Sequence, residues 1–209
     1  MKPILVIPLA GVLLFGCIQR VERRADGFDR AKVIAACDHL IESFQETLKR
    51  ELAAAMTEGG PGKAISVCNV RAPLIADSFS LLPGIDIKRV SLRQRNPYYS
   101  PDDFEVAVLT QFASAGATEP QVHGVLTFDS ANVKRFRYMK EIKVGQLCAN
   151  CHGDPRNFSP GLKAVLAAYY PNDEAVGYAL GDSRGAFSVT VSYPEAKATI
   201  TALLSEKGR

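Results

Sequence analysis

Apolar residues recur at three- and four-residue steps along residues 28–57, which is the spacing of one face of an α-helix. That face carries Val33, Leu40, Ile41, Phe44, Leu48 and Leu52. The run Gly-Gly-Pro-Gly at 59–62 ends this predicted helix. A second helix is predicted from there to residue 75, and Pro73 inside it is expected to kink or split it.

The remaining pattern predicts one more internal helix, four strands and a closing helix. Ser-Pro-Asp-Asp at 100–103 supplies a cap, a first-turn proline and acidic side chains, so a helix is predicted from there to Gly116. Strands are predicted at 85–92, 122–128, 136–144 and 185–193, and the closing helix at 194–206. Because helices come first and strands cluster later, the pattern predicts an α+β fold with one mainly antiparallel sheet.

Composition supports a globular chain and argues against one class of partner. The chain has 209 residues, of which 47% are apolar and 22% charged. This suits one ordinary domain, and it is not the mixture of a disordered or coiled-coil chain. The formal net charge of +3 indicates no basic surface, so no nucleic-acid partner is expected.

The first 16 residues have the pattern of a signal peptide, with one lysine followed by an apolar run too short to span a bilayer. Residues 14–17, Leu-Phe-Gly-Cys, resemble a bacterial lipoprotein cleavage box, which predicts lipidation of Cys17. Ordinary secretion and an uncleaved anchor are the alternatives. Residues 17–27 are then a linker to the membrane anchor, and residues 28–209 form the folded domain. We therefore expect a membrane-anchored periplasmic lipoprotein, in a compartment that permits disulfides.

One motif carries most of the chemical information. Residues 148–152 read Cys-Ala-Asn-Cys-His, the C-x-x-C-H sequence to which c-type haem is attached. The thiols of Cys148 and Cys151 add to the two vinyl groups of one porphyrin, which places them about one helical turn apart. His152 is then held under the iron as the proximal ligand. The motif predicts one covalent haem c.

Three other uses of the motif remain as alternatives. A thioredoxin-like thiol pair is expected in a βαβ unit, which the predicted order of elements does not supply. A zinc site needs further ligands and usually a second paired cluster. A structural disulfide across two intervening residues is strained.

The second axial position on the iron has several candidates. They are His39, His123, Met56, Met139, Cys37 and Cys68. The two histidines fit equally well as surface imidazoles, and the methionines as core side chains. Cys37 and Cys68 alternatively form a disulfide in an oxidising compartment. Spacing alone does not choose among them.

Several segments resemble a family of extracytoplasmic c-type haem domains with a PAS-like fold, a family catalogued as a domain of unknown function. The segments are 64–68 with Ala72 and Pro73, 95–97 with 101–105, 148–153, 169–173 with Ala175, Gly177 and Tyr178, and 181–186. The resemblance covers the chain from about residue 28 onwards and implies a PAS-like antiparallel sheet with long N-terminal helices. It also implies His152 as proximal and Cys68 as distal iron ligand, leaving Cys37 a buried free thiol. A thiolate ligand stabilises ferric iron, so a low reduction potential is expected.

Haem propionates need cations or hydrogen-bond donors. Arg89, Arg93 and Arg95 are spaced so that they share one face of a strand, and Tyr98 follows them. These four residues are the candidate propionate contacts, with Arg184 as a weaker one. The alternative is a solvated basic edge.

The motif and the resemblance leave three roles open. The haem carries electrons, or it reports redox state or a small gas by ligand exchange, and in both cases a redox or signalling partner protein is expected. The alternative is an enzyme of peroxidase type, for which His123 is the acid–base candidate. We favour a redox or sensor protein over an enzyme, because nothing in the sequence marks a catalytic residue.

Overall fold

The computed structural model describes residues 27–206. The signal peptide, Cys17 and nearly all of the predicted linker lie outside the described residues. No helix within 27–206 combines the length and the apolar character needed to cross a bilayer.

A long helical hairpin forms the N-terminal part of the fold. Helix α1 (Arg30–Ser66) begins at Asp29, whose side chain accepts hydrogen bonds from two backbone amides of the first turn. Gly59 and Gly60 leave the helical conformation, Gly60 with φ of 64°, so the chain turns back as the glycine-rich run predicts. Arg71 then binds Glu51 through two hydrogen bonds of 2.8 and 2.9 Å and ties the two arms together.

The returning arm changes its helical type before it ends. It passes through a π-helical turn (Val67–Arg71) into α2 (Ala72–Ser80). Pro73 therefore lies in the first turn of α2, directly after the π turn. The predicted break near Pro73 is present, but it takes the form of a π turn that precedes the proline.

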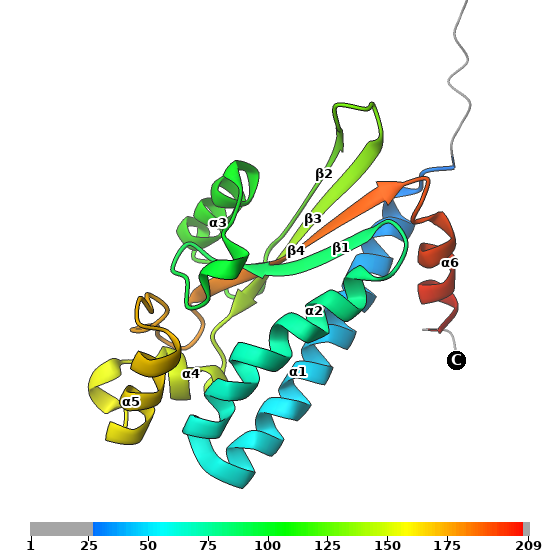
Figure 1. The fold of residues 1–209 in the computed structure, drawn as a ribbon. Helices are drawn as coiled ribbons and strands as arrows, with labels where there is room; N and C mark the ends of the chain where they lie inside the picture. The colour runs from blue at the N-terminus through cyan, green and yellow to red at the C-terminus, as the bar shows by residue number, and fades with distance from the viewer. Residues whose placement is uncertain (1–26, 207–209) are drawn as a thin grey trace, which may run out of the picture.

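Four antiparallel strands form one sheet in the order β1-β4-β3-β2 (Figure 1). They are β1 (Ile85–Val90), β2 (Val122–Phe128), β3 (Lys134–Lys143) and β4 (Ser183–Tyr193). Each overlaps its predicted strand and differs from it by at most two residues at either end. The α+β class, the antiparallel sheet and the long N-terminal helices are confirmed.

The two faces of the sheet are covered by different helices. Helix α1 packs its predicted apolar face on one side, where Phe44 meets Phe187 with ring centroids 5.1 Å apart. Helix α3 (Asp103–Ala115) covers the other side with Val108, Leu109 and Phe112. Met139 is fully buried beneath α3 as a core side chain. The closing helix α6 (Lys197–Glu206) starts three residues later than predicted and lies against α1.

The chain between β3 and β4 makes an excursion at one end of the sheet. It contains α4 (Gln146–His152), a 3-10 turn (Pro155–Asn157) and α5 (Pro160–Tyr169). Helix α5 buries Leu162 and Leu166 against Ile65 of the hairpin. The excursion thus brings the C-x-x-C-H motif close to the turning end of the hairpin (Figure 1).

Candidate functional site

The C-x-x-C-H motif occupies a seven-residue helix, α4, with its histidine as the last residue. Cys148 and Cys151 lie one turn apart, are half-buried, and form no disulfide. Burial raises the pKa of the Cys151 thiol to about 11, so it stays protonated near neutral pH. Both cysteines line a cavity of about 610 Å³. This volume lies within the range of about 300–1,000 Å³ that is usual for small-molecule sites.

His152 is oriented by the main chain. Its Nδ1 lies 2.6 Å from the carbonyl oxygen of Ala175, so Nδ1 carries the proton and donates it, and Nε2 keeps a free electron pair. Burial, reinforced by the positive charge of Arg184, holds the pKa of His152 well below its usual value. The imidazole is therefore neutral, the form in which histidine binds a metal.

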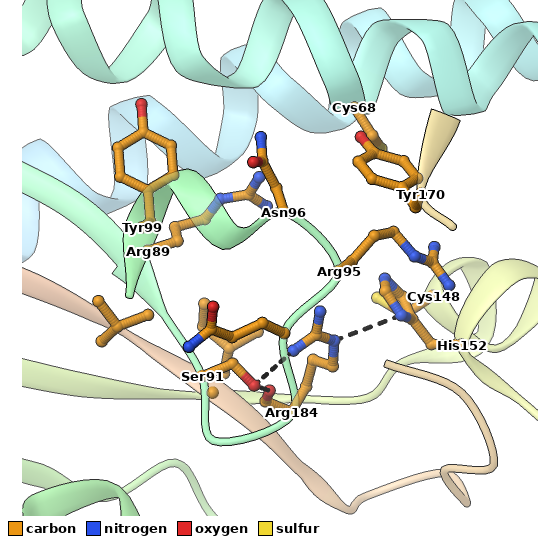
Figure 2. A pocket seen from close by; sticks show the side chains of 14 residues that line it. Cys68, Arg89, Ser91, Arg95, Asn96, Tyr99, Cys148, His152, Tyr170 and Arg184 are labelled. Atoms are coloured by element: carbon orange, nitrogen blue, oxygen red, sulfur yellow. Dashed lines mark hydrogen bonds between the residues drawn. The ribbon is translucent and has the colours of Figure 1, made fainter. Parts of the chain in front are cut away.

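Arg184 at the start of β4 lies against the same ring (Figure 2). Its Nε is 3.3 Å from His152 Nδ1. One ring nitrogen cannot donate to Ala175 and also accept from Arg184, and the 2.6 Å distance assigns the hydrogen bond to Ala175. The guanidinium is held in place by Ser91 Oγ at 2.7 Å and by the carbonyl oxygen of Arg93 at 3.2 Å.

Cys68 enters the site from the hairpin. It is the second residue of the π-helical turn, and such single turns occur frequently at functional sites because they redirect one side chain. Burial raises the pKa of its thiol, while Arg89, Arg95 and Arg184 act in the opposite direction. Cys68 and His152 both line the 610 Å³ cavity and a smaller one of about 170 Å³, so the structure brings the two predicted ligands to one site.

The two cavities differ in character. The larger is lined by apolar side chains of α1 and its surroundings, including Leu48, Leu52, Met56, Leu147 and Phe187. The smaller has a partly apolar lining, with Val90 and Ile142, to which polar side chains are added: Ser91, Gln94, Asn96, Tyr99, Tyr170 and Arg184 (Figure 2). Cys68, Arg89, Arg95, Ile142, Cys148 and His152 are common to both. The two cavities therefore adjoin and share the candidate ligands, and the smaller one adds hydroxyl, amide and guanidinium groups.

Arg89 brings a positive charge to the place where the two cavities meet. Its guanidinium lies 5.7 Å from the ring of Phe44. Among the ion pairs and hydrogen bonds of residues 27–206 none involves the Arg89 side chain. Burial accordingly lowers its pKa from the ordinary arginine value. A half-buried cation that lines both cavities and has no ion pair suits an anion bound there.

The other members of the predicted basic series have different roles, because β1 ends at Val90 and the later residues leave the strand. Arg93 donates to the carbonyl oxygens of Glu174 and Val176 and lies outside both cavities. Arg95 lines the cavities but binds protein acceptors on the excursion. Tyr98 is 76% exposed and is not among the cavity-lining residues.

Of the remaining axial candidates, only Met56 lines the larger cavity. His39 and His123 line neither, and the ring of His123 packs edge-on against Phe104 at 5.7 Å. Cys37 is fully buried in the core and free. Within residues 27–206 no three His, Cys, Asp or Glu side chains gather to hold a metal ion.

The sequence prediction missed the polar lining of the smaller cavity. Ser91 and Gln94 carry no chemical signature in the sequence, whereas Asn96, Tyr170 and Gly185 belong to the segments that carried the resemblance. Those segments converge around His152. Their joint resemblance to the family was the signal in the sequence that pointed to these residues.

Comparison with known proteins identifies the fold and the family. A search of curated proteins finds no match. Among solved structures the fold matches that titled "Crystal structure of the cyanobacterial heme-protein Tll0287", with a TM-score of 0.57 and 23% sequence identity over 79% of this chain and 95% of that one. The model of the Tll0287-like family matches residues 24–192. The chain therefore belongs to the Tll0287-like family.

Proposed function

We propose that this protein is an exported redox protein that carries one covalent c-type haem. The observation that carries the proposal is the C-x-x-C-H motif on a helix beside a cavity, with the Nδ1–H of His152 bound to Ala175. That hydrogen bond leaves Nε2 as the only ring nitrogen available to iron. The match to a solved structure described as a heme-protein supports the same reading.

The residues present fit such a group. Cys148 and Cys151 would each add S–H across one vinyl group, the sulfur bonding to one carbon and the hydrogen to the other, with no leaving group. The larger cavity suits the macrocycle, and the polar groups of the smaller one suit the two propionates. Arg89, a cation without a protein partner where the cavities meet, is the principal propionate contact in this proposal.

The axial pair would be His152 and Cys68. Haem bound here supplies an iron that changes oxidation state by one electron. Cys68 would hold the iron as a thiolate, whose negative charge would favour the ferric state. Arg89 and Arg184 add positive charge that favours the thiolate, as their influence on the Cys68 pKa indicates.

Electron transfer is the role that six-coordinate iron in a buried site serves best. Haem-based sensing is the second candidate, because a thiolate carried on a π turn at the end of a hairpin arm is a ligand whose displacement the helix would register. A peroxidase would need an acid–base residue over an open position. His123 was the candidate for that task, and it packs on Phe104 outside the cavities.

Residues 1–27 complete the proposal. A signal peptide with lipidation at Cys17 would tether the haem domain at the periplasmic face of a membrane, where a redox or signalling partner protein would reach it. Mass spectrometry of the membrane fraction tests this part. An N-terminal peptide with unmodified Cys17 would contradict it.

The haem itself is tested by expression in a host that matures c-type cytochromes. We expect the denatured polypeptide to have the mass of the chain plus one haem and to give a pyridine haemochrome spectrum. Cys148→Ala with Cys151→Ala should abolish covalent haem, whereas Cys37→Ala, a change at a cysteine outside the site, should retain it. A colourless wild-type protein at the bare polypeptide mass would refute the proposal.

Two further measurements separate the roles. A redox-poised absorption and EPR titration gives the ligation and the potential together, and a reversible one-electron couple without ligand exchange supports electron transfer. Binding of CO or NO with loss of the thiolate spectrum supports sensing instead. Peroxide turnover would support an enzyme and count against both.

A further inference from the structure

Residues 173–178, which we call the strap, run along the end of the C-x-x-C-H helix. The amides of Gly177 and Tyr178 donate to the carbonyl oxygens of Gly153 and His152 at 2.7 and 2.9 Å. The carbonyl oxygen of Ala175 in turn receives the His152 Nδ1 proton. Three hydrogen bonds thus join the strap to His152, the last residue of the motif, and to Gly153, which follows it.

The strap has no regular secondary structure that would hold it in place. Backbone hydrogen bonds hold it, namely those to Gly153 and His152 and one from the Glu174 amide to the Gln94 carbonyl oxygen at 2.9 Å. Side-chain contacts add to them, and Asp173 at the start of the strap provides two. Asp173 Oδ1 accepts from the Ala175 amide at 2.9 Å, and Oδ2 accepts from Arg95 Nε at 3.0 Å. The same residue therefore fixes the peptide next to the carbonyl that binds His152 and anchors it to the loop after β1.

Arg95 completes the arrangement from the other side. Its Nη2 lies 2.9 Å from Asp173 Oδ2, 2.5 Å from the carbonyl oxygen of Cys151 and 3.3 Å from that of Ala175. The Arg95 and Asp173 side chains are only 6% and 10% exposed. One guanidinium therefore connects the motif helix, the strap and the acceptor of the His152 proton through its Nε and Nη2 atoms.

We propose that Arg95 and Asp173 are positioning residues for His152, which fix the Ala175 carbonyl and through it the orientation and the donor strength of the imidazole toward iron. The inference rests on the proposed haem for its functional consequence. An imidazole whose Nδ1–H is held by a fixed acceptor is a more basic ligand, and outer partners of this kind affect a metal site through the ligand they orient. A loosened carbonyl would let the ring rotate and would weaken its donation.

The decisive variant is Arg95→Lys in the full haem-loaded chain. Lysine keeps the charge but lacks the Nε donor to Asp173, and its ammonium group ends one bond short of the Nη2 position that meets the carbonyl oxygens of Cys151 and Ala175. We expect covalent haem at the wild-type level, because attachment uses only Cys148 and Cys151. We also expect a higher midpoint potential and a ferric EPR spectrum with more than one set of g-values. The control is Arg156→Lys, at an arginine near the same motif whose side chain is 89% exposed. It should leave the midpoint potential and the g-values unchanged.

A merely structural role predicts a different result. Arg95→Lys would then lower the unfolding midpoint but leave the potential and the g-values as in the wild type, and this outcome overturns the inference. If Arg95→Lys does not fold, Asp173→Asn is measured in its place, since asparagine still offers an oxygen to the Ala175 amide while it loses the ion pair. The midpoint potential and the ferric g-values are measured again, and wild-type values of both in a destabilised variant overturn the inference.

Failure of the proposed function is recognised separately. If the wild-type chain carries no haem, ¹⁵N NMR of the His152 ring in that chain still tests the positioning role. We expect a single Nδ1-protonated tautomer in the wild type and a mixture of tautomers in Arg95→Lys. Identical ring spectra in the two proteins would overturn the inference independently of haem.

Discussion

Replacement of Arg89 by methionine should have opposite effects on the haem-free and the haem-loaded protein. In the structure Arg89 is half-buried and lines both cavities, and its guanidinium lies 5.7 Å from the centre of the Phe44 ring. Burial of a charge without a partner costs several kcal/mol, because the ion loses its hydration. The proposed function assigns a propionate as the missing partner.

The magnitudes follow from these contacts. In the haem-free chain Arg89→Met loses a cation–π contact of about 0.5–1 kcal/mol, which is less than the cost of the buried cation, so the free energy of unfolding rises. In the loaded chain the variant removes a charge-assisted hydrogen bond of about 1.5–3 kcal/mol and leaves a propionate unpaired, so the free energy of unfolding falls.

The assay is guanidinium unfolding of both forms, the haem-free chain being expressed without the maturation machinery. Arg156→Met, an exposed arginine that pairs with Asp154 on the surface, serves as the control and should change either form by no more than about 0.5 kcal/mol. Destabilisation of both forms by the same amount would show that Arg89 serves the protein rather than a bound anion, and would refute the reasoning.

Three further predictions concern single side chains. Cys68→Ser removes the proposed thiolate, so the ferric spectrum should change and the midpoint potential should rise; a spectrum identical to wild type would exclude Cys68 as a ligand. Burial raises the pKa of Cys37 from 9.0 to about 12, so above pH 9.0 the unfolded chain loses a proton that the folded chain keeps. The free energy of unfolding should therefore fall as the pH rises through that window. Measured by urea unfolding at several pH values, this fall should be smaller in Cys37→Ala than in the wild type; an equal fall in the two proteins would contradict the prediction. The buried Glu105 carboxylate binds Lys88 Nζ at 3.0 Å and the Arg137 guanidinium at 3.3 Å, so Glu105→Gln should lower the free energy of unfolding by about 3 kcal/mol. A loss below about 1 kcal/mol in chemical unfolding would show that the cluster is solvated.

The sequence alone determined the features that depend on local chemistry. The break at 59–62 follows from glycines that a helix disfavours, and the strands follow from alternation that a half-buried sheet requires. The attachment motif is equally local, since two thiols and a histidine within five residues are brought together by one helical turn. The short helix α4 and helix α5 were not predicted, because short amphipathic patterns do not stand out from their surroundings.

Only the tertiary structure decided which distant residues share the site. Cys68 and His152 lie 84 positions apart along the chain, and the excursion between β3 and β4 places them on one cavity. Arg89 and Arg95 look alike in the sequence. In the described residues, however, Arg89 lines the cavity without an ion pair, whereas Arg95 forms an ion pair with Asp173. The difference arises because β1 ends at Val90, and beyond that point packing against the strap, not strand periodicity, sets the direction of each side chain. Such contacts between segments far apart in sequence have no local signal, and folding alone brings them together.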